Sequence, residues 1–76
     1  MTESIPPICT LISLVIPPNC KCEKVEPRTY QIVCSDFGTA MGVWERRFES
    51  LYPLLQTGDM LEVVGEDFQI KSYPKP

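Results

Sequence analysis

The stretch Thr29-Tyr-Gln-Ile-Val-Cys-Ser35 decides the fold class, because its residues alternate at the two-residue period of a β-strand. One face of this strand carries Tyr30, Ile32 and Cys34, and the residues between them lie on the other face. The next residues, Asp36-Phe-Gly38, predict a tight turn. Residues 39–44 then predict a returning strand, in which Gly42 indicates a bulge or a sharp bend.

Toward the N-terminus, prolines divide the chain into segments. Residues 8–16, Ile-Cys-Thr-Leu-Ile-Ser-Leu-Val-Ile, lie between Pro7 and Pro17 and are rich in β-branched side chains, so they predict another strand. Residues 19–27 are polar and charged. They predict a loop that joins the two strands.

Toward the C-terminus, the period changes to that of a helix. Residues 45–55 carry an apolar stripe at helical spacing, formed by Phe48, Leu51, Tyr52 and Leu55. Pro53 falls inside this stripe, so we expect a short helix that is irregular near its end. Residues 60–65 and 68–73 predict two further strands, joined by a short hairpin at Glu66-Asp67.

This order of elements predicts an all-β fold with one short helix. Three strands, a helix and two strands match the five-stranded Greek-key barrel called the OB-fold. We expect one such domain over residues 1–76, with residues 1–7 and 74–76 as flexible ends.

Composition limits the functions that the chain can have. There is no histidine, which excludes His-based catalysis and histidine zinc ligands. The sequence offers no glycine-rich phosphate loop and no convincing pair of catalytic carboxylates. We therefore expect no enzymatic activity and no cofactor. The net charge of −3 also excludes nucleic-acid binding through bulk charge.

The four cysteines are Cys9, Cys20, Cys22 and Cys34. Their spacing lacks the paired knuckles of structural zinc sites, so we expect no metal site. We expect Cys9 and Cys34 to be core residues on strands, and Cys20 and Cys22 to lie in the loop. Because the sequence shows neither a secretory signal nor a membrane-spanning stretch, it indicates an intracellular protein with reduced thiols.

Residues 36–65 carry a resemblance to a known family. The residues concerned are Asp36-Phe-Gly-Thr39, Val43-Trp44, Phe48, Leu55, Gly58-Asp59 and Glu62-Val-Val-Gly65. This pattern resembles the OB domains of single-stranded DNA-binding proteins, in particular those of the large subunit of replication protein A. The resemblance covers about half of the chain, and the N-terminal half matches only in its expected strand order.

The resemblance implies a nucleic-acid-binding site. In those domains, aromatic residues at the end of the third strand and at the last hairpin stack on bases, and Trp44 and Phe68 hold the matching positions. Stacking contributes roughly 1–3 kcal/mol per base and needs no net positive charge. The other residues expected to line the groove are Tyr30, Arg28, Lys21 and Lys24. The alternative is that the two aromatics pack in the core and the cations belong to a solvated loop.

The sequence thus predicts a module that binds single-stranded DNA or RNA, weakly when alone. We expect it in the nucleus, within a replication, repair or telomere complex, alongside another OB-fold subunit and without membrane contact. The alternative is a protein–protein interaction subunit that pairs with another OB protein without touching nucleic acid. The acidic charge and the apolar residues near both ends, Ile5 and Tyr73, favour this alternative.

Overall fold

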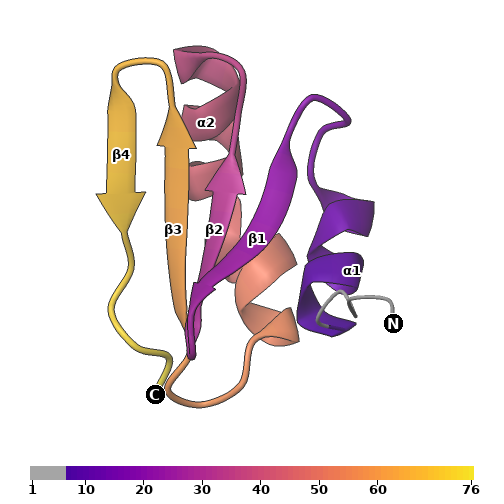
Figure 1. Ribbon diagram of the computed structural model, residues 1–76, viewed down its shortest axis with the longest axis vertical. Coiled ribbons are helices and arrows are strands. Elements are labelled where there is room, and N and C mark those ends of the chain that lie inside the picture. The colour runs from indigo at the N-terminus through magenta and orange to yellow at the C-terminus, as the bar shows by residue number, and fades with distance from the viewer. Residues whose placement is uncertain (1–6) are drawn as a thin grey trace.

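The computed structural model describes residues 7–76. Its elements, in chain order, are α1 (Pro7–Val15), β1 (Lys21–Glu26), β2 (Thr29–Val33), α2 (Phe37–Glu45), η1 (Arg47–Leu51), η2 (Tyr52–Leu54), β3 (Met60–Gly65) and β4 (Phe68–Lys71). The four strands form one sheet in the order β1-β2-β3-β4 (Figure 1). Both end pairs are antiparallel hairpins, whereas β2 and β3 run parallel. A parallel pair needs a crossover, and α2, η1 and η2 supply it.

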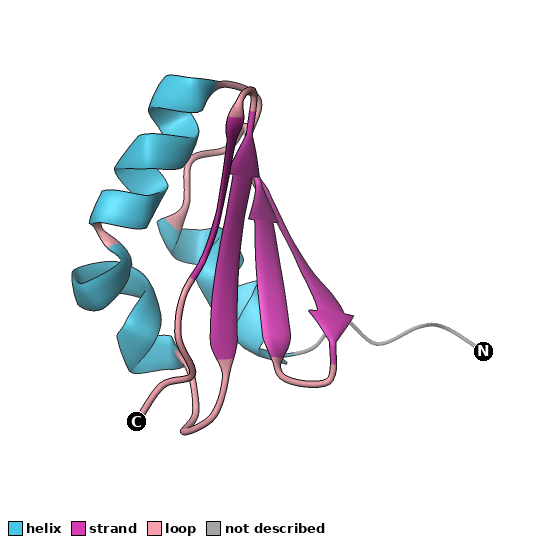
Figure 2. Ribbon diagram, turned by 90° about the vertical axis from the view of Figure 1, so that its left-hand side faces the viewer, coloured by secondary structure: helices cyan, strands magenta, loops and turns pink. Residues whose placement is uncertain are grey.

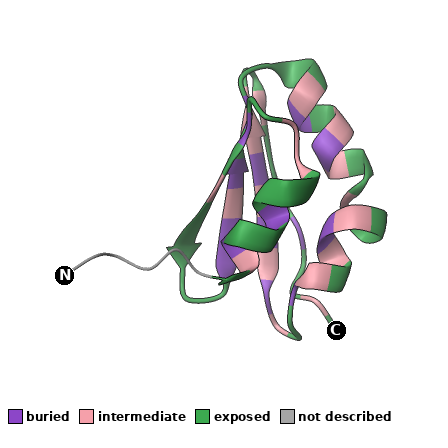
Figure 3. Cartoon of the chain, turned by 90° about the vertical axis from the view of Figure 1, so that its right-hand side faces the viewer, coloured by how far each residue is buried: buried purple, intermediate pink, exposed green. Residues whose placement is uncertain are grey.

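The helices lie on one side of this sheet (Figure 2). The core between the two layers includes five fully buried aliphatic residues: Ile12, Ile32, Leu51, Leu61 and Val63. The outer side of α1 is exposed (Figure 3). The other face of the sheet carries polar residues, among which Gln31 and Gln69 both donate to the carboxylate of Glu62. The fold is therefore an α+β sandwich of two layers.

The predicted five-stranded all-β barrel is wrong. The described chain forms an open sheet of four strands, with β1 and β4 as its edges. Residues 29–35 were predicted as a strand, and residues 29–33 form β2; the hairpin predicted over residues 60–65 and 68–73 is β3 and β4, over residues 60–65 and 68–71. In its turn Asp67 has a positive φ of 55°, which Asp tolerates better than most residues. The errors lie before β2 and between β2 and η1.

Residues 8–16 were predicted as a strand, and residues 7–15 are instead the helix α1. Its two buried residues, Cys9 and Ile12, are three apart, and Ile16 follows four residues later, which is the helical period. Pro7 begins the helix, at the position where its missing N–H costs nothing. Packing of this face outweighs β-branched propensity, which amounts to only a few tenths of a kcal/mol per residue.

Residues 39–44 were also predicted as a strand, and they belong to helix α2. Asp36 is its N-cap: a carboxylate oxygen accepts a hydrogen bond of 2.7 Å from the Thr39 N–H. The predicted turn at residues 36–38 is therefore the start of this helix. The buried residues Ala40 and Val43 again lie three apart and face the core.

The polar segment 19–27 was predicted as a loop, and residues 21–26 form the edge strand β1. An edge strand has one pairing neighbour, and its other side is open to solvent. It can therefore carry polar side chains along most of its length. The short helix predicted over residues 45–55, irregular near its end, takes the form of the π-helix η1 followed by the 3-10 helix η2, which contains Pro53. Of its expected apolar stripe, Leu51 and Leu55 are buried and Phe48 is exposed.

Both chain ends were expected to be flexible. Residues 1–6, including Ile5, lie outside the described residues. At the C-terminus, the backbone of Lys75 makes two hydrogen bonds, from its N–H to the Asp59 carbonyl and from the Gly58 N–H to its carbonyl. Its ammonium also donates to the carbonyls of Tyr52 and Leu55. The tail thus lies against the turn between η2 and β3.

Candidate functional site

An aromatic surface lies where η1 and η2 approach β4 and the C-terminal tail. Its principal side chains are Trp44, Arg47, Phe48, Tyr52, Lys71 and Tyr73, and together with the tail prolines they line a groove of about 640 Å³. We call this the aromatic groove. Phe48 and Tyr73 are its most accessible rings, with 62% and 89% of their surface exposed.

Arg47 organises one wall of the aromatic groove. Its guanidinium carbon lies 3.9 Å from the centroid of the Trp44 ring and 4.4 Å from that of Phe48. The same guanidinium donates a hydrogen bond of 2.8 Å to the Trp44 carbonyl. Phe48 in turn meets Tyr52 edge to face, at 4.9 Å between centroids. Cation–π and edge-to-face contacts of this kind hold the rings in fixed positions before any ligand arrives.

The groove differs in charge from the chain as a whole. Arg47 and Lys71 are among its lining residues, and no Asp or Glu side chain is among the described residues that line it. The ammonium of Lys71 lies 3.4 Å from a carboxylate oxygen of Glu26, in an exposed pair. Exposed pairs of this type are worth little and are screened by salt, so Lys71 can exchange partners. The groove therefore offers flat apolar rings beside Arg47, and Lys71 lies at its edge, with its side chain on the polar face of the sheet.

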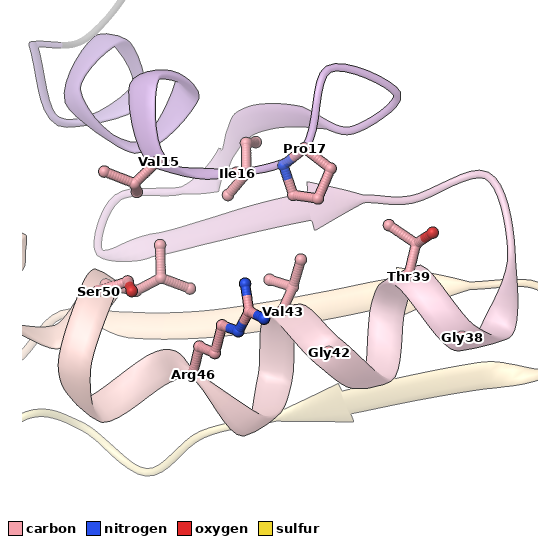
Figure 4. Close-up of a pocket in the computed structure, with 10 residues that line it drawn as sticks. Val15, Ile16, Pro17, Gly38, Thr39, Gly42, Val43, Arg46 and Ser50 are labelled. Atoms are coloured by element: carbon pink, nitrogen blue, oxygen red, sulfur yellow. The ribbon is translucent and has the colours of Figure 1, made fainter.

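A second, smaller hollow of about 200 Å³ lies between the end of α1 and α2 (Figure 4). Val15, Ile16 and Pro17 form one wall, and Gly42 and Val43 contribute to the other. Arg46 extends into the hollow. We call it the α1–α2 cleft.

The six sequence-predicted binding residues do not form one surface. Trp44 lines the aromatic groove. Phe68 begins β4, at the opposite end of that strand from Lys71, and meets Phe37 edge to face at 5.4 Å. Tyr30 is 5% exposed and belongs to the core, where burial raises its pKa. Its ring therefore faces the helices and not a ligand in solvent.

The three predicted cations lie on or near β1. Arg28, in the turn after β1, donates to the Thr57 carbonyl at 2.9 Å and lies 3.7 Å from a carboxylate oxygen of Asp59. Lys24 places its ammonium 5.9 Å from the Tyr30 ring centroid. Lys21 is exposed at the start of β1. Arg28 thus connects two turns, while Lys21 and Lys24 lie on an edge strand away from the aromatic groove.

Most of the groove was not predicted from the sequence. Arg47 was given no binding role, and Phe48 and Tyr52 were predicted on the apolar stripe of a helix. The available signal was spacing: Arg47 follows Trp44 by three residues and Tyr52 follows Phe48 by four, so each pair meets across one helical turn. Lys71 and Tyr73 gave no local signal, because only the fold brings them near residues 44–52.

Comparisons with known proteins do not assign the chain to a family. No protein-family model, curated protein or solved structure matches the chain. Within residues 7–76, no helix has the length and apolar character needed to cross a membrane. The same residues contain no group of three or more carboxylate, cysteine or histidine side chains arranged to hold a metal ion.

Proposed function

We propose that this chain is a small binding module that takes single-stranded nucleic acid in the aromatic groove. One observation carries the proposal: an acidic chain has a groove with four aromatic rings, Arg47 stacked on two of them, Lys71 at its edge, and no acidic side chain among its described lining residues. Unpaired bases stack on such rings, and phosphates pair with the cations between them. The proposed ligand is the one predicted from the sequence, but its proposed site is the aromatic groove and not the surface of a barrel.

The roles of the groove residues follow from their exposure and contacts. Phe48 and Tyr73 expose most of their rings and stack with bases. Arg47 is held over Trp44 and points its remaining N–H donors at phosphate. Lys71 leaves its exposed pair with Glu26 to meet a second phosphate.

The number of cations limits the affinity and its dependence on salt. With two phosphates neutralised, log K falls with log salt at a slope of about −1.4 for a single strand. Binding by the chain alone is accordingly weak, which fits a subunit of a larger assembly. The predicted nuclear location and role in genome maintenance depend on this proposal.

The test uses the single tryptophan, Trp44. A titration with oligo-dT of about 15 nucleotides, within the usual site size, should quench its fluorescence at low and at physiological salt. Phe48→Ala and Tyr73→Ala should each weaken binding about 5- to 150-fold, the range that corresponds to losing one stacked base at roughly 1–3 kcal/mol. A labelled oligonucleotide followed by anisotropy measures these affinities independently of tryptophan.

Phe37→Ala is the matched control. Phe37 is a partly exposed aromatic at the start of α2, but it does not line the groove. Its removal should leave the affinity unchanged. Flat titrations at both salt concentrations, or equal losses in Phe37→Ala and Phe48→Ala, would contradict the proposal.

A second candidate is the protein-interaction subunit, and the outer side of α1 favours it. Leu11, Leu14 and Val15 are exposed there, with 77% of Leu14 accessible to solvent. An apolar helix side of this kind suits a second protein chain. Sedimentation of the wild type and of Leu14→Ser tests this candidate. Self-association, or binding of a partner, that Leu14→Ser abolishes would support an interaction role. A wild type that is monomeric at every concentration would exclude pairing between two copies of the chain.

A further inference from the structure

The four cysteines meet two by two in the fold. The Cys9 and Cys22 sulfur atoms lie 3.3 Å apart, and those of Cys20 and Cys34 lie 3.0 Å apart. All four are free thiols. The sequence analysis placed Cys9 on a strand and Cys22 in a loop, whereas they lie on α1 and β1. The first pair thus links a helix to an edge strand.

The sheet register explains the second pair. Lys21 pairs with Val33 across the antiparallel β1–β2 hairpin, and one further step along this register sets Cys20 opposite Cys34. Opposed residues in an antiparallel pair have Cα atoms about 4.5–5.5 Å apart. This separation falls within the range that a disulfide spans.

The first pair follows from the same register. Cys22 lies two residues after Cys20, so both side chains project from the same face of β1 toward the helices. There α1 packs on β1 and presents its buried Cys9, which is 1% exposed. Each cysteine therefore has a sulfur partner on a different element.

We propose that Cys9–Cys22 and Cys20–Cys34 are two dithiol sites, each of which closes into an intramolecular disulfide when a low-molecular-weight disulfide is the oxidant. In each site, one protein thiolate attacks a sulfur of the small disulfide and expels one small thiolate. The second protein thiolate then attacks the resulting mixed disulfide and expels the other. Two cysteines are oxidised, one small disulfide is reduced to two thiols, and the two protons pass to the leaving thiolates.

The solvent exposure and the pKa of each thiol set the order and the rate of these steps. Cys22 is the least buried of the four cysteines, so it meets the oxidant first. Its pKa is raised mainly by burial, and the neighbouring Cys9 and the Glu23 carboxylate raise it further. Burial, Cys20 and Asp36 raise the pKa of Cys34 to about 12. Since the thiolate is the nucleophile, closure is slow at neutral pH and accelerates as pH rises.

The two bonds have defined structural consequences. Cys9–Cys22 would fasten α1 to the edge strand β1, and Cys20–Cys34 would fasten the start of β1 to the end of β2. Each closes a loop of roughly 15 residues, and cross-links of this length should raise Tm by about 10 °C or more. None of the four cysteines lines the aromatic groove. The inference is therefore independent of the proposed nucleic-acid site.

The experiment compares matched and mismatched double variants in oxidised glutathione at pH 8.5. The matched pairs Cys20→Ala with Cys34→Ala, and Cys9→Ala with Cys22→Ala, each leave one contacting pair. The mismatched pair Cys20→Ala with Cys22→Ala leaves Cys9 and Cys34, which do not contact one another. Free thiols are counted by maleimide labelling and intact mass, after small mixed disulfides have been scored by their added mass.

We expect both matched variants to lose two thiols with a mass decrease of two hydrogens, while the mismatched variant keeps its thiols or carries glutathione. Wild-type protein gives a second measurement that needs no substitution. Cleavage at Leu14, after Lys21 and after Arg28 places all four cysteines on separate peptides, so mass spectrometry identifies the partners directly. Any other pairing in the wild type, equal closure in matched and mismatched variants, or four free thiols after oxidation overturns the proposal.

Discussion

The two sides of helix α2 are packed to different densities. On the side facing β3, Gly65 approaches so closely that an added Cβ would lie 2.7 Å from the Ala40 Cβ and 2.8 Å from the Asp36 carbonyl oxygen. On the side facing α1, a Cβ at Gly42 would meet nothing within 4 Å. The contact between α2 and β3 therefore positions the helix on the sheet, while the open side leaves the α1–α2 cleft.

Gly65→Ala should have the largest effect on stability, because it disturbs the close packing between α2 and β3. The new methyl would push β3 away from α2, because Ala40 and the Asp36 backbone cannot move like the end of a flexible side chain. We expect the free energy of unfolding to fall by about 1–3 kcal/mol, the usual cost of overpacking a core. Urea unfolding followed by circular dichroism measures it.

A double variant identifies which atoms cause the loss of stability in Gly65→Ala. Ala40→Gly removes the Cβ that Gly65→Ala would meet, yet it leaves the Asp36 carbonyl oxygen in place. The effect of Ala40→Gly alone on the urea midpoint is measured first and subtracted from that of the double variant. The remaining loss in midpoint should be smaller than the loss in Gly65→Ala alone, but not zero. An unchanged midpoint in Gly65→Ala would mean that β3 and α2 are not in close contact.

Gly42→Ala is the matching substitution on the open side, and we expect the opposite sign. Alanine is better than glycine inside a helix by about 0.8–1 kcal/mol, and no neighbour opposes the added methyl. The urea midpoint should therefore rise. A midpoint that falls would show that α1 closes over α2 more tightly than the cleft indicates.

The same contrast shows what could be predicted from the sequence. β2, β3 and β4 were predicted because each has a local signal, either the alternation of residues 29–35 or the hairpin turn at residues 66–67. α2 was missed, although Asp36 and Thr39 have the spacing of an N-cap pair, because Gly38 was interpreted as part of a tight turn and Gly42 as a bulge in a returning strand.

The candidate site was only partly predictable for a related reason. Trp44 was identified as a binding residue, and it lines the aromatic groove. Its groove partners Lys71 and Tyr73 are more than 25 residues away in sequence, and no local pattern joins them to residues 44–52. The resemblance placed Phe68 beside Trp44 because it assumed a barrel. In the open sheet, Phe68 instead packs on Phe37.

Asp36 has two roles at the N-terminus of α2, because its carbonyl oxygen faces Gly65 and its side-chain carboxylate caps the helix. The Thr39 N–H, followed by the Thr39 hydroxyl, lowers the pKa of its carboxyl group below the usual value of 3.8. Its stabilising effect is therefore fully present above that value, and it is lost as pH falls through the lower pKa of the folded state. We expect this to be the smallest effect, because the carboxylate is exposed and screened by solvent.

Asp36→Asn isolates this contribution, because asparagine caps helices as well as aspartate does but carries no charge that titrates. Thermal unfolding between pH 2 and pH 7 should show the wild-type Tm declining more steeply at the acidic end than the Tm of Asp36→Asn. The two curves should then converge once the carboxyl is protonated. Parallel curves over the whole range would mean that Thr39 does not bind the charged carboxylate, and that the N-terminus of α2 is held by its contact with Gly65 alone.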